Sequence, residues 1–244
     1  MKFILFSICL IAITSNLSAQ NKMRSTEELT ADTSAWPLLQ QEIAEAKNKV
    51  EILPVIAGQN KEAIYQIQVT THSFMGAVVY FTGGILIDNG WIRILGSGST
   101  KLNRTLPGFN KGKSFNEYGE RPPFLLIADD AVGGFFAING GEFGQDLGQI
   151  YYLAPDRLTR EALHITYQQF LSFCFASDLT KFYDGLRWKT WQEDLKSLSA
   201  DQGFNFYPFL WTEEGKDINK DSRSMVPIEE LYIFLTENMK QHKQ

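Results

Sequence analysis

Five side chains with oxygen donors gather in two glycine-rich stretches in the middle of the chain, and their types suit ligand binding. They are Asp129, Asp130, Asn139, Glu142 and Asp146. Calcium takes about six to eight oxygen ligands from such loops, and two carboxylates a few ångströms apart can act as acid and base in glycan hydrolysis. Asp, Asn and Gly are also the ordinary residues of turns. Nothing matches the complete EF-hand pattern, so we predict binding by these five residues without a metal or other cofactor.

The residues needed for nucleophilic catalysis or for a zinc site are sparse. The sequence lacks the G-x-S-x-G turn that marks the nucleophile of α/β-hydrolases. His72 follows two threonines, so a hydroxyl partner is conceivable, but a catalytic triad requires three groups in one geometry. Cys174 lies between Phe173 and Phe175, which predicts a buried thiol of low reactivity. The histidines are too widely spaced to form a zinc-ligand pair.

Two other stretches invite a functional interpretation. Residues 96–101, GSGSTK, lack the spacing of a phosphate-binding loop. Residues 204–211, FNFYPFLW, could offer aromatic faces to a sugar or a peptide. Aromatic side chains also dominate core burial, so we favour packing for this run and keep ligand binding as the alternative.

The elements that position these residues follow from hydrophobic patterning. Strands are expected at 50–55, 76–81 and 85–94, as three runs within 124–153, and as an extended run at 204–211. Helices are expected at 34–49, 61–68, 177–186 and 189–198, and from about Thr166 and Pro227 onward. Asp88-Asn89-Gly90 predicts a hairpin turn inside 85–94, because Asn and Gly tolerate positive φ angles. The pattern indicates an α+β fold, a mainly antiparallel sheet flanked by helices.

One α+β domain, residues 34–244, accounts for all of these elements. The polar segment 20–33 before it is expected to be flexible. Residues 96–123 are rich in Gly, Ser, Lys, Asn and Pro, which predicts a loop insertion with at most a single helical turn. A loop of this length within a compact domain is often functional.

The first residues resemble a secretory signal peptide. Lys2 precedes an apolar core at 3–13, and Leu17-Ser18-Ala19 ends the segment, so cleavage is expected after Ala19. The core is shorter than the roughly 20 residues that cross a bilayer. Cys9 lies inside this core and not at a cleavage boundary, which disfavours a lipid anchor. We therefore predict a signal peptide at 1–19, a periplasmic or secreted location and no stable membrane insertion.

The composition and charge limit the kinds of partner that we expect. The net charge is −5, with acidic and basic residues interspersed, so nucleic acid is a poor partner. Removal of Cys9 with the signal peptide leaves Cys174, so no intrachain disulfide can form. Stability must then come from core burial, and 44% apolar residues suffice for a sizeable core.

Several segments resemble a bacterial family of proteins with a domain of unknown function, number 2625. The matching segments are 24–29 (RSTEEL), Trp36-Pro37, 83–88 (GGILID), 90–98 (GWIRILGSG), 133–141 (GGFFAINGG) and 206–211 (FYPFLW). This resemblance covers nearly the whole mature chain and implies no activity. A looser likeness to the SUKH superfamily of immunity proteins rests on Asp129-Asp130, Gly133-Gly134, 150–153, Pro155-Asp156 and Phe170-Leu171. It implies an α+β domain whose sheet recognises protein partners.

These observations favour a non-enzymatic binding or protein-interaction module. Its partner would be a protein or a cell-wall fragment, which contacts the acidic turns at the rim of the sheet. The alternative is a cell-envelope hydrolase that uses the turn carboxylates on a glycan or peptide substrate.

Overall fold

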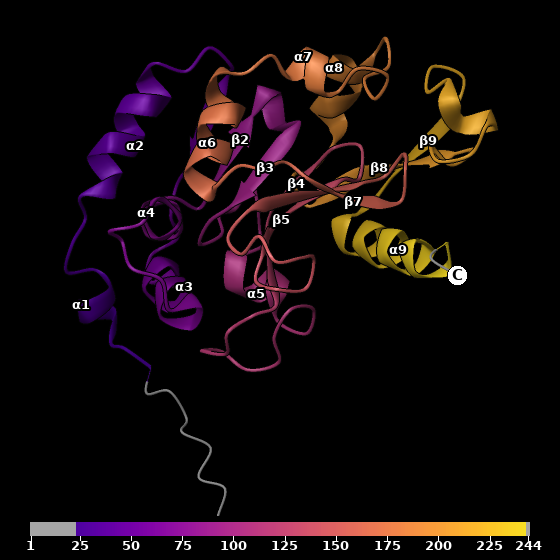
Figure 1. Ribbon diagram of the computed structural model, residues 1–244. Coiled ribbons are helices and arrows are strands. Elements are labelled where there is room, and N and C mark those ends of the chain that lie inside the picture. The colour runs from indigo at the N-terminus through magenta and orange to yellow at the C-terminus, as the bar shows by residue number, and fades with distance from the viewer. Residues whose placement is uncertain (1–22, 243–244) are drawn as a thin grey trace, which may run out of the picture.

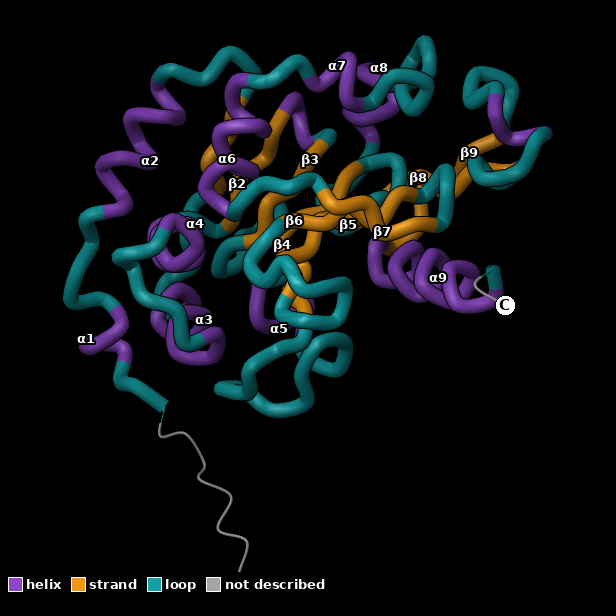
Figure 2. Tube along the Cα trace, in the orientation of Figure 1, coloured by secondary structure: helices purple, strands orange, loops and turns teal. Residues whose placement is uncertain are grey.

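Seven antiparallel strands, joined in chain order, form the main sheet within residues 23–242, the part that the computed structural model describes. The strands are β1 (Val50–Leu53), β2 (Gly84–Ile87), β3 (Ile92–Leu95), β4 (Phe124–Asp130), β5 (Phe135–Asn139), β6 (Ile150–Ala154) and β7 (Thr159–Ala162). In Figures 1 and 2, most N-terminal helices lie to one side of the sheet, and the C-terminal helix lies beyond its other end. The predicted α+β class is confirmed. The expected signal peptide lies outside the described residues.

The predicted hairpin between β2 and β3 is confirmed. Ile87 pairs with Ile92 across a single turn of 3-10 helix, η1 (Asp88–Gly90). Within this turn Asn89 has a φ of 61° and Gly90 a φ of 89°. The left-handed conformation suits these two residue types, which explains why this short sequence signal sufficed.

The segment 76–81 is helical, so the strand predicted there is wrong. It belongs to α4 (Phe74–Phe81), whose N-cap Ser73 accepts a hydrogen bond from the Gly76 N–H. The helix packs against neighbouring helices, and its residues 76–79 are all buried. A continuous apolar run suits a helix enclosed on several sides as well as a strand. A Cβ atom at Gly76 would lie 1.9 Å from the Thr70 carbonyl oxygen, so only glycine permits this approach.

The other helices follow the predictions, with shorter bounds except at α3, which begins two residues earlier and ends one residue earlier than expected. They are α2 (Ala35–Ala44), α3 (Gln59–Ile67), α6 (Tyr167–Ala176), α7 (Leu179–Phe182), α8 (Trp191–Asp194), the 3-10 turn η2 (Leu195–Ser197) and α9 (Ile228–Gln241). Helix α6 begins after Thr166, which forms a capping box with Gln169. Helix α9 has Glu229 and Glu230 in its first turn, where negative charge favours the helix dipole.

A smaller sheet of two strands lies near the C-terminus. Strand β8 (Gln202–Tyr207) covers the first half of the aromatic run and pairs with β9 (Ser222–Pro227), which the sequence did not predict. Helix α9 packs on both strands. The Phe204 N–H donates to the Ala131 carbonyl at 2.8 Å, which attaches this sheet to the chain just after β4.

Two segments, one expected to be flexible and the other expected to be a loop with at most a single helical turn, each contain a short helix. The described part of 20–33 includes α1 (Thr26–Leu29), in which Leu29 is 1% exposed. Segment 96–123 includes α5 (Leu106–Asn110), and its Leu102 and Phe115 are buried. Both segments therefore contribute side chains to the core.

Candidate functional site

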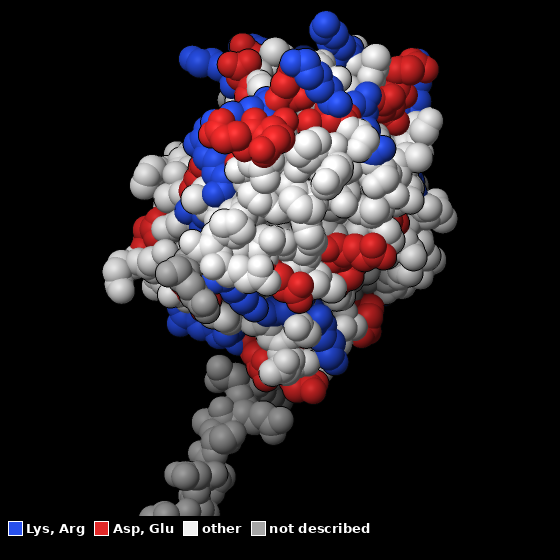
Figure 3. Space-filling view, turned by 90° about the vertical axis from the view of Figure 1, so that its right-hand side faces the viewer, with Lys and Arg blue, Asp and Glu red and all other residues white. Residues whose placement is uncertain are grey.

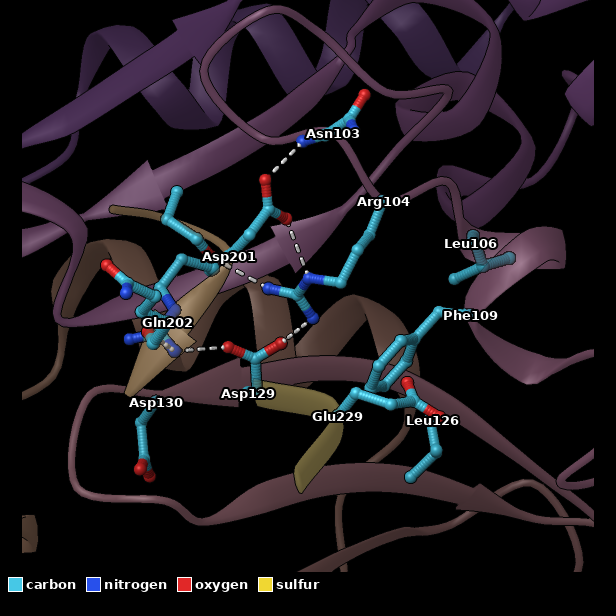
Figure 4. A network of polar contacts seen from close by, with 12 residues as sticks. Asn103, Arg104, Leu106, Phe109, Leu126, Asp129, Asp130, Asp201, Gln202 and Glu229 are labelled. Atoms are coloured by element: carbon cyan, nitrogen blue, oxygen red, sulfur yellow. Dashed lines mark hydrogen bonds and ion pairs between the residues drawn. The ribbon is translucent and has the colours of Figure 1, made fainter. Parts of the chain in front are cut away.

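A buried ion-pair network surrounds Asp129, one of the five predicted site residues. This Asp129 network consists of Arg93, Arg104, Asp129 and Asp201. Asp129 pairs with Arg93 at 2.7 Å and with Arg104 at 2.5 Å, and Arg104 also pairs with Asp201 at 2.9 Å. Figure 4 shows the Arg104 guanidinium between the two carboxylates. Arg93 and Asp129 have no exposed side-chain surface, whereas Arg104 is 13% exposed.

The Asp129 network joins the two sheets. Arg93 lies on β3 and donates to the Gln202 carbonyl at the start of β8. Arg104 donates to the Ala200 carbonyl, and Asp201 accepts from the Asn103 N–H. Burial lowers the pKa of Arg93, and the charge of Asp129 partly offsets this effect. With two arginines and two aspartates, the network is balanced in formal charge and serves a structural connection.

Asp130 belongs to a separate buried cluster on the opposite face of β4, because successive strand residues point to opposite faces. Its carboxylate accepts from the Tyr152 hydroxyl at 2.8 Å, the Tyr183 hydroxyl at 3.0 Å and the Gly134 N–H at 2.8 Å. Burial raises the pKa of Asp130, and these hydrogen bonds limit the rise. In Figure 4 its side chain points away from Arg104.

The other three predicted site residues lie in or near the turn after β5. Asn139 is buried and organises this turn, accepting from the Gly141 and Phe143 N–H groups and donating to Asp146. Asp146 also accepts from the Tyr151 hydroxyl, which lowers the pKa of this carboxyl. Glu142 is exposed. Only this turn matches the expected exposed acidic rim.

The placement of Asp129 and Asp130 corrects the prediction that they lie in an exposed turn. Both belong to β4 and have no exposed surface. In this structure neither side chain reaches the surface, and the two carboxylates point to opposite faces of β4. A binding role for the five residues stays a prediction, and no arrangement among the described residues favours the hydrolase alternative. Within 23–242, no three Asp, Glu, His or Cys side chains form a group that could hold a metal ion.

His72 lies next to a hydroxyl and a carboxylate, the two groups that a catalytic triad would contain, but their geometry differs from that of a triad. Its Nδ1 atom lies 3.1 Å from the Ser34 hydroxyl and 2.9 Å from the Asp32 carboxylate. A triad needs the carboxylate on one ring nitrogen and the hydroxyl on the other. Because both contacts converge on Nδ1, His72 cannot relay a proton between them.

Cys174 is fully buried in α6, as predicted, and burial raises the pKa of its thiol well above the ordinary value. A thiol with a raised pKa forms little thiolate at neutral pH, and the thiolate is the reactive form. Cys174 is therefore a core residue.

The surface has a cleft of about 580 Å³ between the β1 edge and η2. Lys101 pairs with Glu51 in it at 2.7 Å, and Lys196 pairs with Glu193 at 2.6 Å. Its volume falls within the range of small-molecule sites, roughly 300–1,000 Å³, but such sites are mostly apolar. Because four of its five charged side chains are paired with one another and its lining is not mainly apolar, this cleft offers little to hold a ligand tightly.

An apolar region lies around β8, β9 and α9. Phe209 stacks on Trp211, and both contact Phe234 of α9. Tyr207 is 69% exposed and Met225 is 46% exposed. The aromatic run was assigned to core packing, and Phe204 and Phe206 are buried as expected, whereas Tyr207 lies on the surface.

The sequence interpretation missed three members of the Asp129 network, namely Arg93, Arg104 and Asp201. A signal existed at Arg93, which is a single charge in the apolar run WIRIL and must find a partner if that run is buried. No comparable signal marked Arg104 or Asp201, since both lie in polar segments.

The chain matches the model of the family "Protein of unknown function DUF2625" over residues 26–231, and it belongs to this family. It is similar to an uncharacterized protein of Haemophilus influenzae, with 44% identity over 211 residues, covering 86% of this chain and 92% of that protein. It is also similar to the putative uncharacterized protein YbfG of Escherichia coli, with 42% identity over 220 residues, covering 90% and 100% respectively. The family resemblance is confirmed, and these comparisons give no support to the SUKH likeness.

The helices among residues 23–242 fall short of the length and apolar character that crossing a bilayer requires.

Proposed function

We propose that the protein is an exported, non-enzymatic binding module that takes up an extended segment of a partner protein along the open edge of β9. The observation that carries this proposal is the state of that edge. Within the described residues β9 pairs only with β8, and Ser222, Ser224 and Met225 are exposed. An open strand edge presents unpaired N–H and C=O groups, which an added strand can satisfy.

Charge distinguishes β9 from β1 and β7, the two edge strands of the seven-stranded sheet. Proteins protect open edges with charged side chains. On the β1 edge Glu51 pairs with Lys101, and β7 carries Arg160 and Glu161. The single charged residue of β9, Arg223, is 24% exposed and pairs with Asp194 at 3.0 Å, whereas the side chains of Glu51 and Lys101 on the β1 edge are 45% and 54% exposed. The β9 edge is therefore less protected by charge than the β1 and β7 edges.

The surroundings of β9 suit an apolar partner. Figure 3 faces the side on which β9 and α9 lie in Figure 1, and a broad area without charged residues appears there, bordered by Lys, Arg, Asp and Glu. Met225 on β9, Tyr207 on β8 and Ile233 on α9 expose large apolar side chains. In strand addition the main chain supplies affinity and alternate side chains supply specificity. We therefore expect the bound segment to be extended, with apolar residues at every second position.

Selection from a random peptide library against the native protein tests this function. Selected peptides should show alternating apolar residues and should slow hydrogen exchange of the backbone at 222–226. Met225→Lys adds a charge to the edge and should weaken binding by about tenfold, equivalent to about 1.4 kcal/mol. Ile52→Lys is the matched control, since Ile52 is 40% exposed on the β1 edge. Binding that ignores Met225→Lys, or that protects another segment, contradicts the proposal.

A further inference from the structure

Asp221, just before β9, is a buried carboxylate without a partner. It is 4% exposed, and neither of its side-chain oxygens has a hydrogen bond. Of the carboxylates between residues 23 and 242, it is the one whose two oxygens are both enclosed and unpartnered. An ionised carboxylate in this state costs several kcal/mol unless a counter-charge or hydrogen bonds compensate.

The acids around Asp221 already have cationic partners. Asp221 lines a cleft of about 660 Å³ that also contains Glu193 and Asp194. Glu193 pairs with Lys196 at 2.6 Å, and Asp194 pairs with Arg223 at 3.0 Å. No basic side chain pairs with Asp221 among the described residues.

The spacing of the oxygen-bearing residues before Asp221 matches the start of a calcium loop. Residues 217–221 read Asp-Ile-Asn-Lys-Asp, and the EF-hand loop takes side-chain ligands from its positions 1, 3 and 5 in the pattern D-x-[DN]-x-[DN]. Asp217 is close enough that its charge, after burial, raises the pKa of Asp221. The Asn219 side-chain oxygen accepts a hydrogen bond from the Lys189 N–H at 2.9 Å. This bond fixes the orientation of the Asn219 amide and leaves the second lone pair of its oxygen free to bind a cation.

We propose that Asp217, Asn219 and Asp221 form a binding site for a hard divalent cation, with Ca²⁺ as the preferred ion. Two carboxylates and an amide oxygen are the donors that Ca²⁺ prefers, and Mg²⁺ demands a more regular octahedron. The absence of His and Cys from this loop disfavours zinc. Lys220 now pairs with Asp217 at 2.8 Å, but it is 82% exposed, so an arriving cation displaces a weak surface contact.

The loop departs from the complete EF-hand pattern in two ways, and both indicate weak binding. Ser222 stands where the pattern has glycine, and Ile228 stands where it has the bidentate glutamate. A site with fewer charged ligands belongs among the extracellular modules, whose dissociation constants are about 0.1–1 mM. This inference does not rest on strand addition at β9, because it concerns a different ligand and different side chains.

Titration of the native protein with CaCl₂ after EDTA treatment tests the site. At about ten times the dissociation constant, Ca²⁺ should raise the melting temperature by about 3–5 °C, and Mg²⁺ at the same concentration should raise it by less than about 1 °C. Terbium provides a second readout, since Trp188 directly precedes the residue that contacts Asn219 and can sensitise its emission. A melting temperature that ignores Ca²⁺ overturns the proposal.

Two variants locate the response. Asp221→Asn removes the unpartnered charge, so it should fold at least as well as the native protein in EDTA and should lose the calcium response. Asp217→Asn should also lose it. Asp184→Asn, at an exposed aspartate outside the loop, is the matched control and should keep the full response. A calcium response that survives in Asp221→Asn would place the ion elsewhere and overturn the assignment.

Discussion

Arg93 and Asp129 are direct register partners on β3 and β4, and their side chains form an ion pair of 2.7 Å with no exposed surface on either residue. The attraction within a buried ion pair offsets the free energy lost on dehydration only when further hydrogen bonds satisfy the remaining donors and acceptors of both side chains. Arg104 supplies a second cation to Asp129, and the Gln202 carbonyl accepts from Arg93. The pair therefore anchors β8 and the chain around Arg104 to the large sheet.

Removing one member of this pair should be strongly destabilising. Asp129→Asn leaves Arg93 buried without its counter-charge, and we expect a loss of about 3–5 kcal/mol in the free energy of unfolding, measured in urea. The double variant Arg93→Met/Asp129→Leu removes both charges and should cost less than the single change. A loss below about 1 kcal/mol for Asp129→Asn would contradict the structural role.

Asp130 and Glu142 should respond in opposite ways to truncation, although the sequence placed them in one site. Asp130→Ala removes the acceptor of two buried tyrosine hydroxyls and should cost about 2–4 kcal/mol. Glu142→Ala changes an exposed turn and should stay within about 0.5 kcal/mol. Tyr183→Phe should cost about 1 kcal/mol, because it removes one of the hydrogen bonds. Equal melting temperatures for Asp130→Ala and Glu142→Ala would refute the buried cluster.

The sequence predicted those elements whose signals are local. The turn at Asp88-Asn89-Gly90 and the start of a helix near Thr166 each depend on a few adjacent residues, and both were predicted. The helix at 76–81 was missed because its burial comes from neighbouring helices, which the sequence does not display. Strand β9 was missed because SRSMVP has too few apolar residues to show alternation.

The burial of Asp129 and Asp130 was not predicted, because the residues that contact them are distant in sequence. Asp129-Asp130 followed by Gly133-Gly134 has the composition of a turn, yet the strand continues through both aspartates. A carboxylate at the end of an apolar strand can remain buried when cations converge on it. Those cations come from Arg93 and Arg104, and sequence spacing does not reveal that convergence. Asp129 and Asp130 were also predicted to share one binding role, although adjacent residues of a strand point to opposite faces of the sheet.

Cys174 should label slowly in the folded protein. Its thiol is enclosed in α6, so a thiol reagent should react about a thousandfold faster after denaturation, as expected for a group that requires opening of the core. The control is Ser172→Cys in a Cys174→Ala background, at an exposed position of the same helix. Equal rates for Cys174 in the native and denatured chains would reopen the case for a reactive cysteine.

Export should leave a mature chain that begins at Gln20. The pattern of Lys2, the apolar core 3–13 and Ala19 predicts cleavage after Ala19. Intact-mass analysis of the periplasmic or secreted fraction measures this directly. Leu10→Arg interrupts the apolar core and should keep the precursor in the cytoplasm. A native protein that retains Met1 or Lys2 in the cytoplasm would contradict the prediction.

The carboxylate of Asp194 should make part of the stability of the C-terminal region depend on pH. Burial alone would raise its pKa, but hydrogen bonds from Trp188 and Thr190 and the charge of Arg223 outweigh burial, so the folded pKa lies below the usual value. A lowered folded pKa stabilises the protein at pH values above the unfolded pKa of about 3.9. This contribution disappears as the pH falls through the folded pKa.

Asp194→Asn should therefore melt a few degrees below the native protein at pH 7, a loss of about 1–2 kcal/mol. The gap should narrow below about pH 3.9, while Asp184→Asn should show no gap at either pH. A difference that stays constant from pH 7 to about pH 2.5 would mean that Asp194 acts through its shape and not through its charge.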